Sequence, residues 1–146
     1  MSKIILVTGA SGFIGSRLIK SLWEQGYTNI RAVTFGRGLR EDFKGWQNVE
    51  HLRGDLQTAE FCGKVTENVD VIFHCAANTS NALDTKFNPL LHVTPNVEMN
   101  VNLLEQSWKN KVRKFLFISS NSSRSTCSPI NKVVSPDLVI STFLSI

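Results

Sequence analysis

The sequence has few cysteines, no block of like charges and no long apolar run. Its three cysteines (Cys62, Cys75 and Cys127) are odd in number and lack the spacing of a metal site or a disulfide framework. We therefore expect a reduced, cytoplasmic protein without a bound metal. The formal net charge of +4 comes from scattered Lys and Arg, which excludes an obvious nucleic-acid patch. The apolar run after Lys3 ends at Gly9, so we expect no exported leader and no membrane span.

The composition fits one globular domain. The chain has 146 residues, of which 42% are hydrophobic and 19% are charged. This is long enough to bury a substantial core and apolar enough to form one.

Three glycines at the start of the chain, spaced three apart, predict a phosphate-binding turn. They follow a continuous apolar segment at residues 4–7, which is typical of a buried parallel strand. Gly9 lets the chain turn sharply off the strand, Gly12 lets the backbone approach a pyrophosphate, and Gly15 lets the next helix pack on the sheet. The free N–H groups at the positive end of that helix would hold the phosphates.

Strand-like and helix-like segments alternate along the chain. We predict strands at residues 4–7, 30–35, 49–53, 69–73 and 114–118, and helices at residues 13–25, 58–67 and 95–108. We expect the last helix to start at Pro95 and to turn Val97, Val101, Leu104 and Ser107 or Trp108 inward. Alternation of this kind predicts an α/β fold with a doubly wound (Rossmann) parallel sheet of order 3-2-1-4-5. Ligands bind such sheets at the carboxyl ends of the strands.

Three motifs resemble one family. The spacing T-G-x-x-G-x-x-G at residues 8–15 resembles the short-chain dehydrogenase/reductase superfamily. The run Gly12-Phe13-Ile14-Gly15 is similar to its extended branch, the NAD-dependent epimerase/dehydratase family. The run His74-Cys75-Ala76-Ala77 resembles the H-x-A-A element of that branch, and residues 92–100 resemble fucose-synthase-type epimerase/reductases. The resemblance covers about residues 4–121 and implies an NAD(P)-dependent epimerase, dehydratase or reductase acting on nucleotide sugars.

The pattern and the resemblance together predict a set of cofactor-binding residues. They are Gly9, Ser11, Gly12, Phe13, Ile14, Gly15, Arg37, Asp55, Leu56, Ala76, Ala77 and Asn96. The resemblance places Asp55 beside the adenine, but an Asp before a helix can equally be its N-cap. It implies that Asn96 braces backbone near the site. We interpret His74 as a packed, hydrogen-bonded side chain rather than a catalytic base.

The segment after the second predicted strand bears on cofactor choice. An acidic residue about 20 positions beyond the glycines would hydrogen-bond the adenosine ribose of NAD. Phe35 and Gly36 occupy that region, Arg37 and Arg40 follow, and the first carboxylate is Glu41. A guanidinium suits a 2′-phosphate, so the pattern favours NADP modestly over NAD. The alternative is that Arg37 is a solvated loop charge.

The resemblance implies a catalytic tyrosine with a lysine four residues later, and the sequence has no such pair. Tyr27 is its only tyrosine and lies far from the predicted catalytic edge. Ser128 and Lys132 have the spacing, but Pro129 disfavours a shared helical face there. Ser120 is the candidate that would orient a substrate oxygen. We therefore interpret the chain as a cofactor-binding half that is inactive alone, or alternatively as a non-catalytic NAD(P)-binding sensor or scaffold.

The last part of the chain differs in character from the rest. Residues 122–129 are polar and rich in Ser, and residues 138–146 are uncharged and apolar. We predict a cofactor domain at residues 1–121 and a divergent tail at residues 122–146, without the part that would bind a nucleotide sugar. Although residues 138–144 have high β propensity, we expect them to stay mobile and to leave the fifth strand as an open edge. Such an edge favours self-association, and a homodimer is one form of it.

Overall fold

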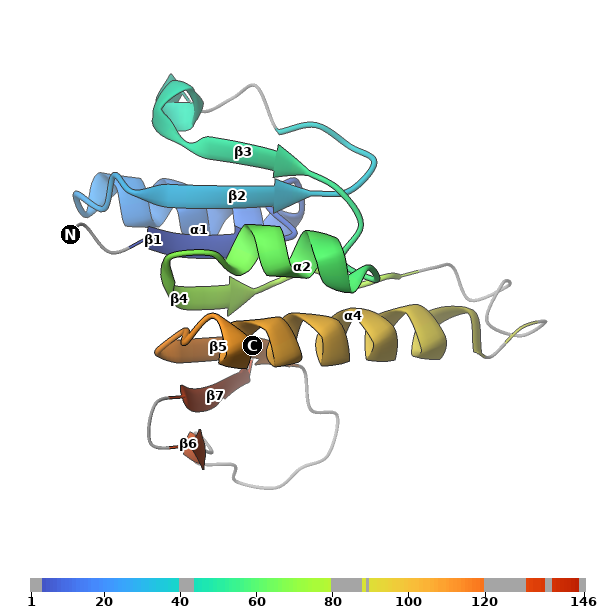
Figure 1. Ribbon diagram of the computed structural model, residues 1–146. Helices are drawn as coiled ribbons and strands as arrows, with labels where there is room; N and C mark the ends of the chain where they lie inside the picture. Colours follow the sequence, from blue (N-terminus) through green and yellow to red (C-terminus); the bar gives the residue numbers. More distant parts are fainter. Residues whose placement is uncertain are drawn as a thin grey trace.

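The computed structural model describes residues 4–39, 44–79, 88, 90–119, 131–135 and 138–144 (Figure 1). Strands and helices alternate through most of this length, as the sequence predicts. The elements are β1 (Ile4–Thr8), α1 (Phe13–Glu24), β2 (Ile30–Thr34), the 3-10 helix η1 (Lys44–Asn48), β3 (Glu50–Arg53), α2 (Ala59–Thr66), β4 (Val69–His74), α4 (Leu90–Lys109), β5 (Lys114–Ser119), β6 (Asn131–Ser135) and β7 (Leu138–Leu144).

The strands form one sheet in the order β3-β2-β1-β4-β5-β7-β6. The strands β3, β2, β1, β4 and β5 are all parallel, which confirms the predicted doubly wound order 3-2-1-4-5. Strand β1 lies inside the sheet between β2 and β4, and its Leu6 and Val7 are both fully buried although they point to opposite faces. This burial on both faces explains why the first apolar segment is continuous rather than alternating.

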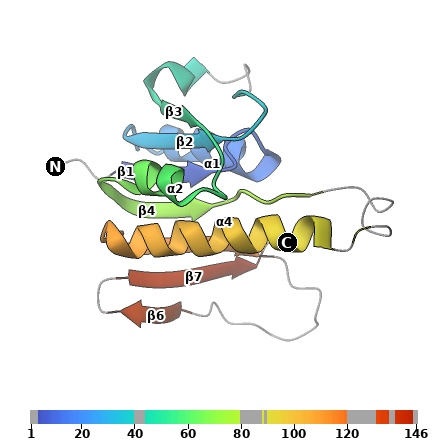
Figure 2. The ribbon, with the colours of Figure 1, turned by 45° about the vertical axis from the view of Figure 1, so that its right-hand side comes forward.

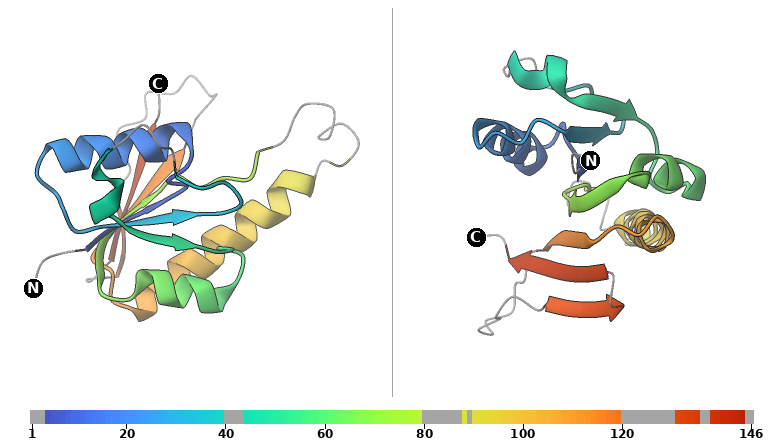
Figure 3. Two further views of the ribbon diagram at one scale, coloured as in Figure 1. Left: turned by 90° about the horizontal axis from the view of Figure 1, so that it is seen from above. Right: turned by 60° about the vertical axis from the view of Figure 1, so that its left-hand side comes forward.

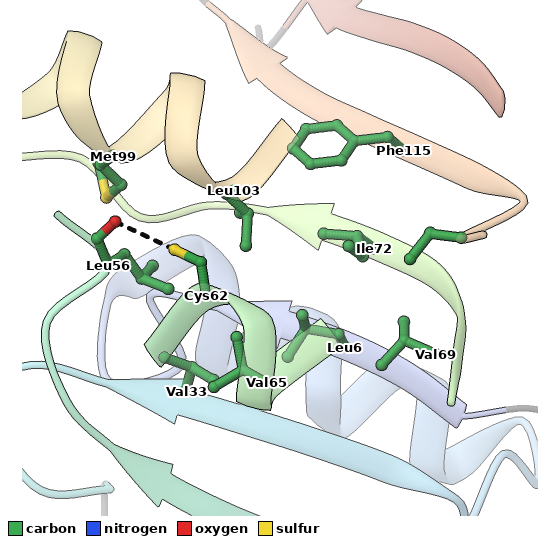
Figure 4. Packing of buried hydrophobic residues seen from close by; sticks show 11 residues of the cluster. Leu6, Val33, Leu56, Cys62, Val65, Val69, Ile72, Met99, Leu103 and Phe115 are labelled. Atoms are coloured by element: carbon green, nitrogen blue, oxygen red, sulfur yellow. Dashed lines mark hydrogen bonds between the residues drawn. The ribbon is translucent and has the colours of Figure 1, made fainter. Parts of the chain in front are cut away.

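Helices cover the two faces of the sheet separately. Helix α1 lies on one face, and α2 and α4 lie side by side on the other (Figure 3). The core under α2 and α4 contains Leu6, Val33, Leu56, Cys62, Val65, Val69, Ile72, Met99, Leu103, Val112 and Phe115 (Figure 4). The core under α1 contains Ile5, Val7, Ala10, Ile19, Leu22, Ile30, Ala32 and Val49. These two layers hold the carboxyl ends of β1 to β4 at one edge.

One expectation about α4 is wrong, and another is wrong in part. The helix begins at Leu90, so Pro95 lies inside it rather than at its first turn. Of the side chains expected to point inward, Ser107 is buried and Leu104 packs against the core, but Val97, Val101 and Trp108 are exposed by 53%, 56% and 60%. Met99 and Leu103 are buried instead (Figure 4). The apolar spacing predicted part of the inward side of α4 wrongly, because polar side chains of this helix bind neighbouring loops, as described below, and occupy positions on that side.

The expectation that residues 138–144 stay outside the sheet is also wrong. They form β7, which pairs in parallel with β5 from Lys114↔Val139 to Ser119↔Leu144, and β6 pairs with β7 in antiparallel fashion (Figure 2). A strand inside a sheet needs no polar–apolar alternation, so the continuous apolar run was not evidence against pairing. The N–H and C=O groups along the outer side of β5 are thereby satisfied.

A buried arginine joins the sheet to α2 at the edge opposite the carboxyl ends. Arg31 on β2 is only 8% exposed. Its Nε donates to Glu50 Oε2 at 2.8 Å, and its Nη1 donates to the carbonyl oxygens of Val65 and Glu67 at 2.9 and 2.8 Å. The guanidinium thus satisfies carbonyl groups at the end of α2 that have no partner within the helix.

Candidate functional site

A cleft of about 460 Å³ opens at the carboxyl ends of β1 to β4. Its volume is in the range of small-molecule and cofactor sites. Four loops and one helix contribute to it: the β1–α1 turn, the segments after β2, β3 and β4, and α4. The lining residues are Gly9, Ser11, Gly12, Val33, Thr34, Phe35, Arg37, Gly54, Asp55, Leu56, Gln57, Cys75, Ala76, Ala77, Asn78, Thr79, Pro95 and Met99.

The glycines of the β1–α1 turn are required by close backbone contacts. Gly9 has a φ of +66°, and a Cβ there would lie 2.7 Å from the backbone N of Ala76. A Cβ on Gly15 would overlap the carbonyl oxygen of Gly9. At Gly12 a Cβ would meet only the carbonyl oxygen of Gly9, at 3.1 Å, so the space over Gly12 is nearly open. The turn therefore packs tightly against β4 and α1 and exposes bare backbone to the cleft.

The first turn of α1 provides a positive end beside this backbone. Its N-cap is Gly12, which makes no side-chain capping hydrogen bond, and the turn contains no acidic residue. Backbone N–H groups at the start of a helix have no partner within it and carry a partial positive charge. The turn is thus suited to an anionic group such as a pyrophosphate.

Behind the cleft, a buried hydrogen-bonded chain links β1, β4 and α4. Thr8 Oγ1 lies 2.7 Å from His74 Nδ1, and His74 Nε2 lies 2.8 Å from Asn100 Oδ1. Ala76 N–H donates to Thr8 Oγ1 at 3.2 Å. Burial lowers the pKa of His74 to about 4, against which the hydrogen bond with Asn100 acts weakly, so the imidazole is neutral at pH 7. His74 is 1% exposed and does not line the cleft, as the packed interpretation of the sequence predicts.

A second asparagine of α4 fixes the segment after β4. Asn96 Oδ1 accepts from the backbone N–H of Asn78 at 2.8 Å, and Asn96 Nδ2 donates to the Asn78 carbonyl at 3.0 Å. This two-point contact holds the backbone that lines the cleft after Ala77. It is the bracing that the resemblance implies for Asn96, although Asn96 itself does not line the cleft.

Asp55 is not the N-cap of α2. That position belongs to Thr58, whereas Asp55 Oδ1 accepts from the backbone N–H of Gln57 at 2.9 Å. The carboxylate is therefore held by its own turn, and Asp55 lines the cleft. The N-cap interpretation of Asp55 is therefore wrong.

Two arginines flank the loop after β2. Arg37 is exposed and lines the cleft. Arg53, at the end of β3, donates from Nη2 to the carbonyl oxygen of Gly36 at 2.6 Å. The contact fixes the backbone next to Arg37. No carboxylate occurs among residues 34–37, where Arg37 is the only charged residue.

Comparison with known proteins identifies the family. The model of the NAD dependent epimerase/dehydratase family matches residues 5–135, most of the chain. The chain belongs to this family. The UDP-glucose 4-epimerase of Vibrio cholerae is 31% identical over 121 residues, which are 82% of this chain and 35% of that protein.

Other relatives carry different names. The 3 beta-hydroxysteroid dehydrogenase/Delta 5-->4-isomerase of Mycobacterium tuberculosis is 31% identical over 81% of this chain and 32% of its own length. Among solved structures, MoeE5 in complex with UDP-glucose and NAD has a TM-score of 0.66 and 26% identity over 86% of this chain and 39% of that one. The chain thus spans between about a third and two fifths of these relatives. None of the helices in the described part of the chain is long and apolar enough to cross a membrane.

Most of the residues that the pattern and the family resemblance predict to bind the cofactor lie together. The assigned residues that line the cleft are Gly9, Ser11, Gly12, Arg37, Asp55, Leu56, Ala76 and Ala77. Phe13, Ile14, Gly15 and Asn96 are next to the cleft in sequence or by contact but do not line it. Ser120, the candidate for orienting substrate in this epimerase/dehydratase chain, lies outside the described residues.

Sequence reasoning missed several residues of the site. Thr8 and Asn100 lie in the motifs of residues 8–15 and 92–100, and Arg53 lies in none. All three act through contacts with distant parts of the chain, which the motifs do not reveal. Phe35 was noted only for not being acidic, yet it lines the cleft and is 71% exposed. Cys75 also lines the cleft, but burial raises the pKa of its thiol to about 11, so it remains protonated and is a poor nucleophile at pH 7.

Proposed function

We propose that this chain is the dinucleotide-binding half of an NAD(P)-dependent nucleotide-sugar epimerase, dehydratase or reductase. One observation carries the proposal: the open backbone of Gly12, the loop of Asp55 and the small residues Ala76 and Ala77 line a single cleft beside the start of α1. The family match and the relative named as a UDP-glucose 4-epimerase support the substrate class.

Each part of the cleft has a role in this proposal. The backbone around Gly12 and the first turn of α1 hold the pyrophosphate, because both present N–H groups without competing side chains. Asp55 and Leu56 hold the adenine, and the small side chains of Ala76 and Ala77 leave room for the nicotinamide half. The bound cofactor supplies hydride transfer, while the chain itself binds, orients and partly shields it.

We also propose a modest preference for NADP over NAD. Arg37 lines the cleft beside the loop that Arg53 holds, and no carboxylate stands among residues 34–37 to bind a ribose 2′-hydroxyl. A planar guanidinium pairs well with a phosphate.

We expect Arg37→Ala to weaken NADP binding about tenfold and to leave NAD binding nearly unchanged, because only NADP carries the 2′-phosphate. Titration of both cofactors by calorimetry measures the ratio. Lys109→Ala removes an equally charged side chain from the far end of α4, where Lys109 pairs with Glu105, and is the control. Tighter binding of NAD to the unchanged protein, or an unaltered ratio in Arg37→Ala, contradicts the preference.

The sequence contains no tyrosine with a lysine four residues later, the pair that the resemblance implies for proton transfer. Its only tyrosine, Tyr27, lies between α1 and β2 and is 51% exposed, whereas the cleft lies where β1 and β2 end. This observation favours, as a second candidate, a non-catalytic NAD(P)-binding sensor or scaffold. In either case self-association, including a homodimer, and a cytoplasmic location belong to the proposal.

We expect residues 1–146 to convert UDP-glucose or GDP-mannose at least 10²–10⁴-fold more slowly than complete family enzymes, since positioned acid–base groups contribute about that factor. Coupled spectrophotometric assays with NAD and with NADP measure the rate. An active complete epimerase assayed in parallel shows that the assay works. Turnover comparable to that control means that another residue of this chain replaces the tyrosine.

A further inference from the structure

The buried chain from Ala76 through Thr8 and His74 to Asn100 has a fixed direction of hydrogen bonding. Asn100 Oδ1 can only accept, so His74 Nε2 carries the proton and donates to it. A neutral imidazole then accepts at Nδ1, and the Thr8 hydroxyl is the donor to that nitrogen. The Thr8 oxygen remains free to accept from Ala76 N–H, which it does.

One end of this hydrogen-bonded chain, at Thr8 and Ala76, adjoins two walls of the cleft. Thr8 immediately precedes Gly9, whose α-carbon packs so closely on Ala76 that no Cβ fits between them. Ala76 and Gly9 both line the cleft. Strands β1 and β4 pair up to Thr8 and His74, and just beyond this pair the Thr8 hydroxyl joins the β1–α1 turn to the segment after β4 through its contacts with His74 Nδ1 and Ala76 N–H.

Among the described residues, the His74 ring has no hydrogen-bond partners other than Thr8 and Asn100. The ring is 1% exposed and packs against the rings of Phe115 and Phe117, at centroid distances of 5.8 and 5.5 Å. These aromatic neighbours offer neither charge nor water to replace Asn100. Loss of the Asn100 oxygen would leave the buried Nε2–H unsatisfied or move the proton to Nδ1. In the second case the Thr8 oxygen would accept from both Nδ1–H and Ala76 N–H, and its own buried hydroxyl proton would lose the His74 acceptor.

We infer that Asn100, acting through His74 and Thr8, is a positioning residue that pre-organises the cleft for the dinucleotide. The inference rests on the proposed cofactor function. The hydrogen-bonded chain supports the part of the cleft that binds the portion common to NAD and NADP. We therefore expect its loss to weaken the binding of both cofactors alike. This separates it from the 2′-phosphate preference ascribed to Arg37.

Two pairs of variants test this role in the full 146-residue chain. Asn100→Leu keeps the size of the side chain without its acceptor, and Thr8→Val keeps the shape without the hydroxyl. We expect each to weaken NAD and NADP by about tenfold, because the walls must be ordered on binding. Thr8→Ser, which keeps the hydroxyl, restores most of the affinity lost in Thr8→Val. Ser107→Ala removes another buried hydroxyl from α4, one that donates to Leu103 O, and leaves both affinities unchanged.

A measurement on the unchanged protein keeps the inference testable even if a variant does not fold. Nitrogen NMR of the His74 ring shows the proton on Nε2 at pH 7, with Nδ1 unprotonated; the opposite tautomer overturns the inference. So does equal affinity of Asn100→Leu and the unchanged protein, or an equal loss in Ser107→Ala. If the unchanged protein binds neither NAD nor NADP, the proposed function fails, whatever the tautomer of His74.

Discussion

Gly9→Ala is expected to lower the free energy of unfolding by about 4 kcal/mol or more, which would leave much of the protein unfolded at 25 °C. Gly9 has a φ of +66°, which costs a residue with a Cβ about 1 kcal/mol. The larger cost is steric, because the new atom would lie 2.7 Å from Ala76 N and 2.8 Å from Ala76 Cα. These are backbone atoms of the segment that follows β4, and they cannot rotate away as a side chain could. Urea unfolding followed by circular dichroism measures the loss.

Substitutions at two other glycines separate the cost of the backbone conformation, the cost of steric overlap and the effect on ligand binding. Gly26→Ala tests the backbone conformation alone, since Gly26 has a φ of +88° and nothing within 4 Å of an added Cβ, and we expect a loss of about 1 kcal/mol. Gly12→Val tests ligand binding, because the valine side chain would enter the space over the turn that we assign to the pyrophosphate. An added Cβ would meet only one protein atom, the carbonyl oxygen of Gly9. It should impair binding of NAD and NADP far more than it impairs stability. Similar losses of stability in Gly9→Ala and Gly26→Ala would refute the steric argument.

The sequence allowed most of the sheet to be predicted because its signals there are local. The apolar run at residues 4–7, the glycine turn and the alternating helices fix the five parallel strands and the edge where their loops meet. The order 3-2-1-4-5 follows from chain connectivity, without knowledge of any side-chain contact. Strand β7 was missed for a physical reason: an open strand edge accepts any extended segment with good β propensity, and alternation is not needed.

The parts of the site that were not predicted depend on contacts between distant residues. Asn100 belongs to the family-like run of residues 92–100, but only its approach to His74, 26 positions away, gives its side chain a role. Arg53 is 17 positions from Gly36, whose carbonyl it binds. The inner side of α4 was misjudged for the same reason, because Asn96 and Asn100 occupy inward positions that an apolar pattern would not assign to polar residues.

Arg31→Met is expected to destabilise the protein by about 3 kcal/mol, although Arg31 is far from the cleft. Its side chain is 9% exposed and binds three acceptors, of which two are the carbonyl oxygens of Val65 and Glu67. Methionine fills a similar volume but leaves the end of α2 without donors. Glu50 is half exposed, so water can solvate its carboxylate once the arginine is gone. We therefore expect a loss at the lower end of the range for broken buried pairs.

Lys20→Met is the matched control for this prediction. Lys20 and Glu24 form an ion pair of 3.9 Å on the surface of α1, with side chains exposed by 57% and 63%. Such pairs contribute less than about 0.5 kcal/mol, so Lys20→Met should scarcely change the urea midpoint.

Arg31→Lys keeps the charge but cannot reach all three acceptors in one plane, and we expect it to recover only part of the loss. If Arg31→Met were as stable as Lys20→Met, the arginine would not anchor α2 to the sheet. Because Arg31 lies at the edge opposite the glycine turn, the folded fraction of Arg31→Met should bind NAD and NADP as tightly as the unchanged protein.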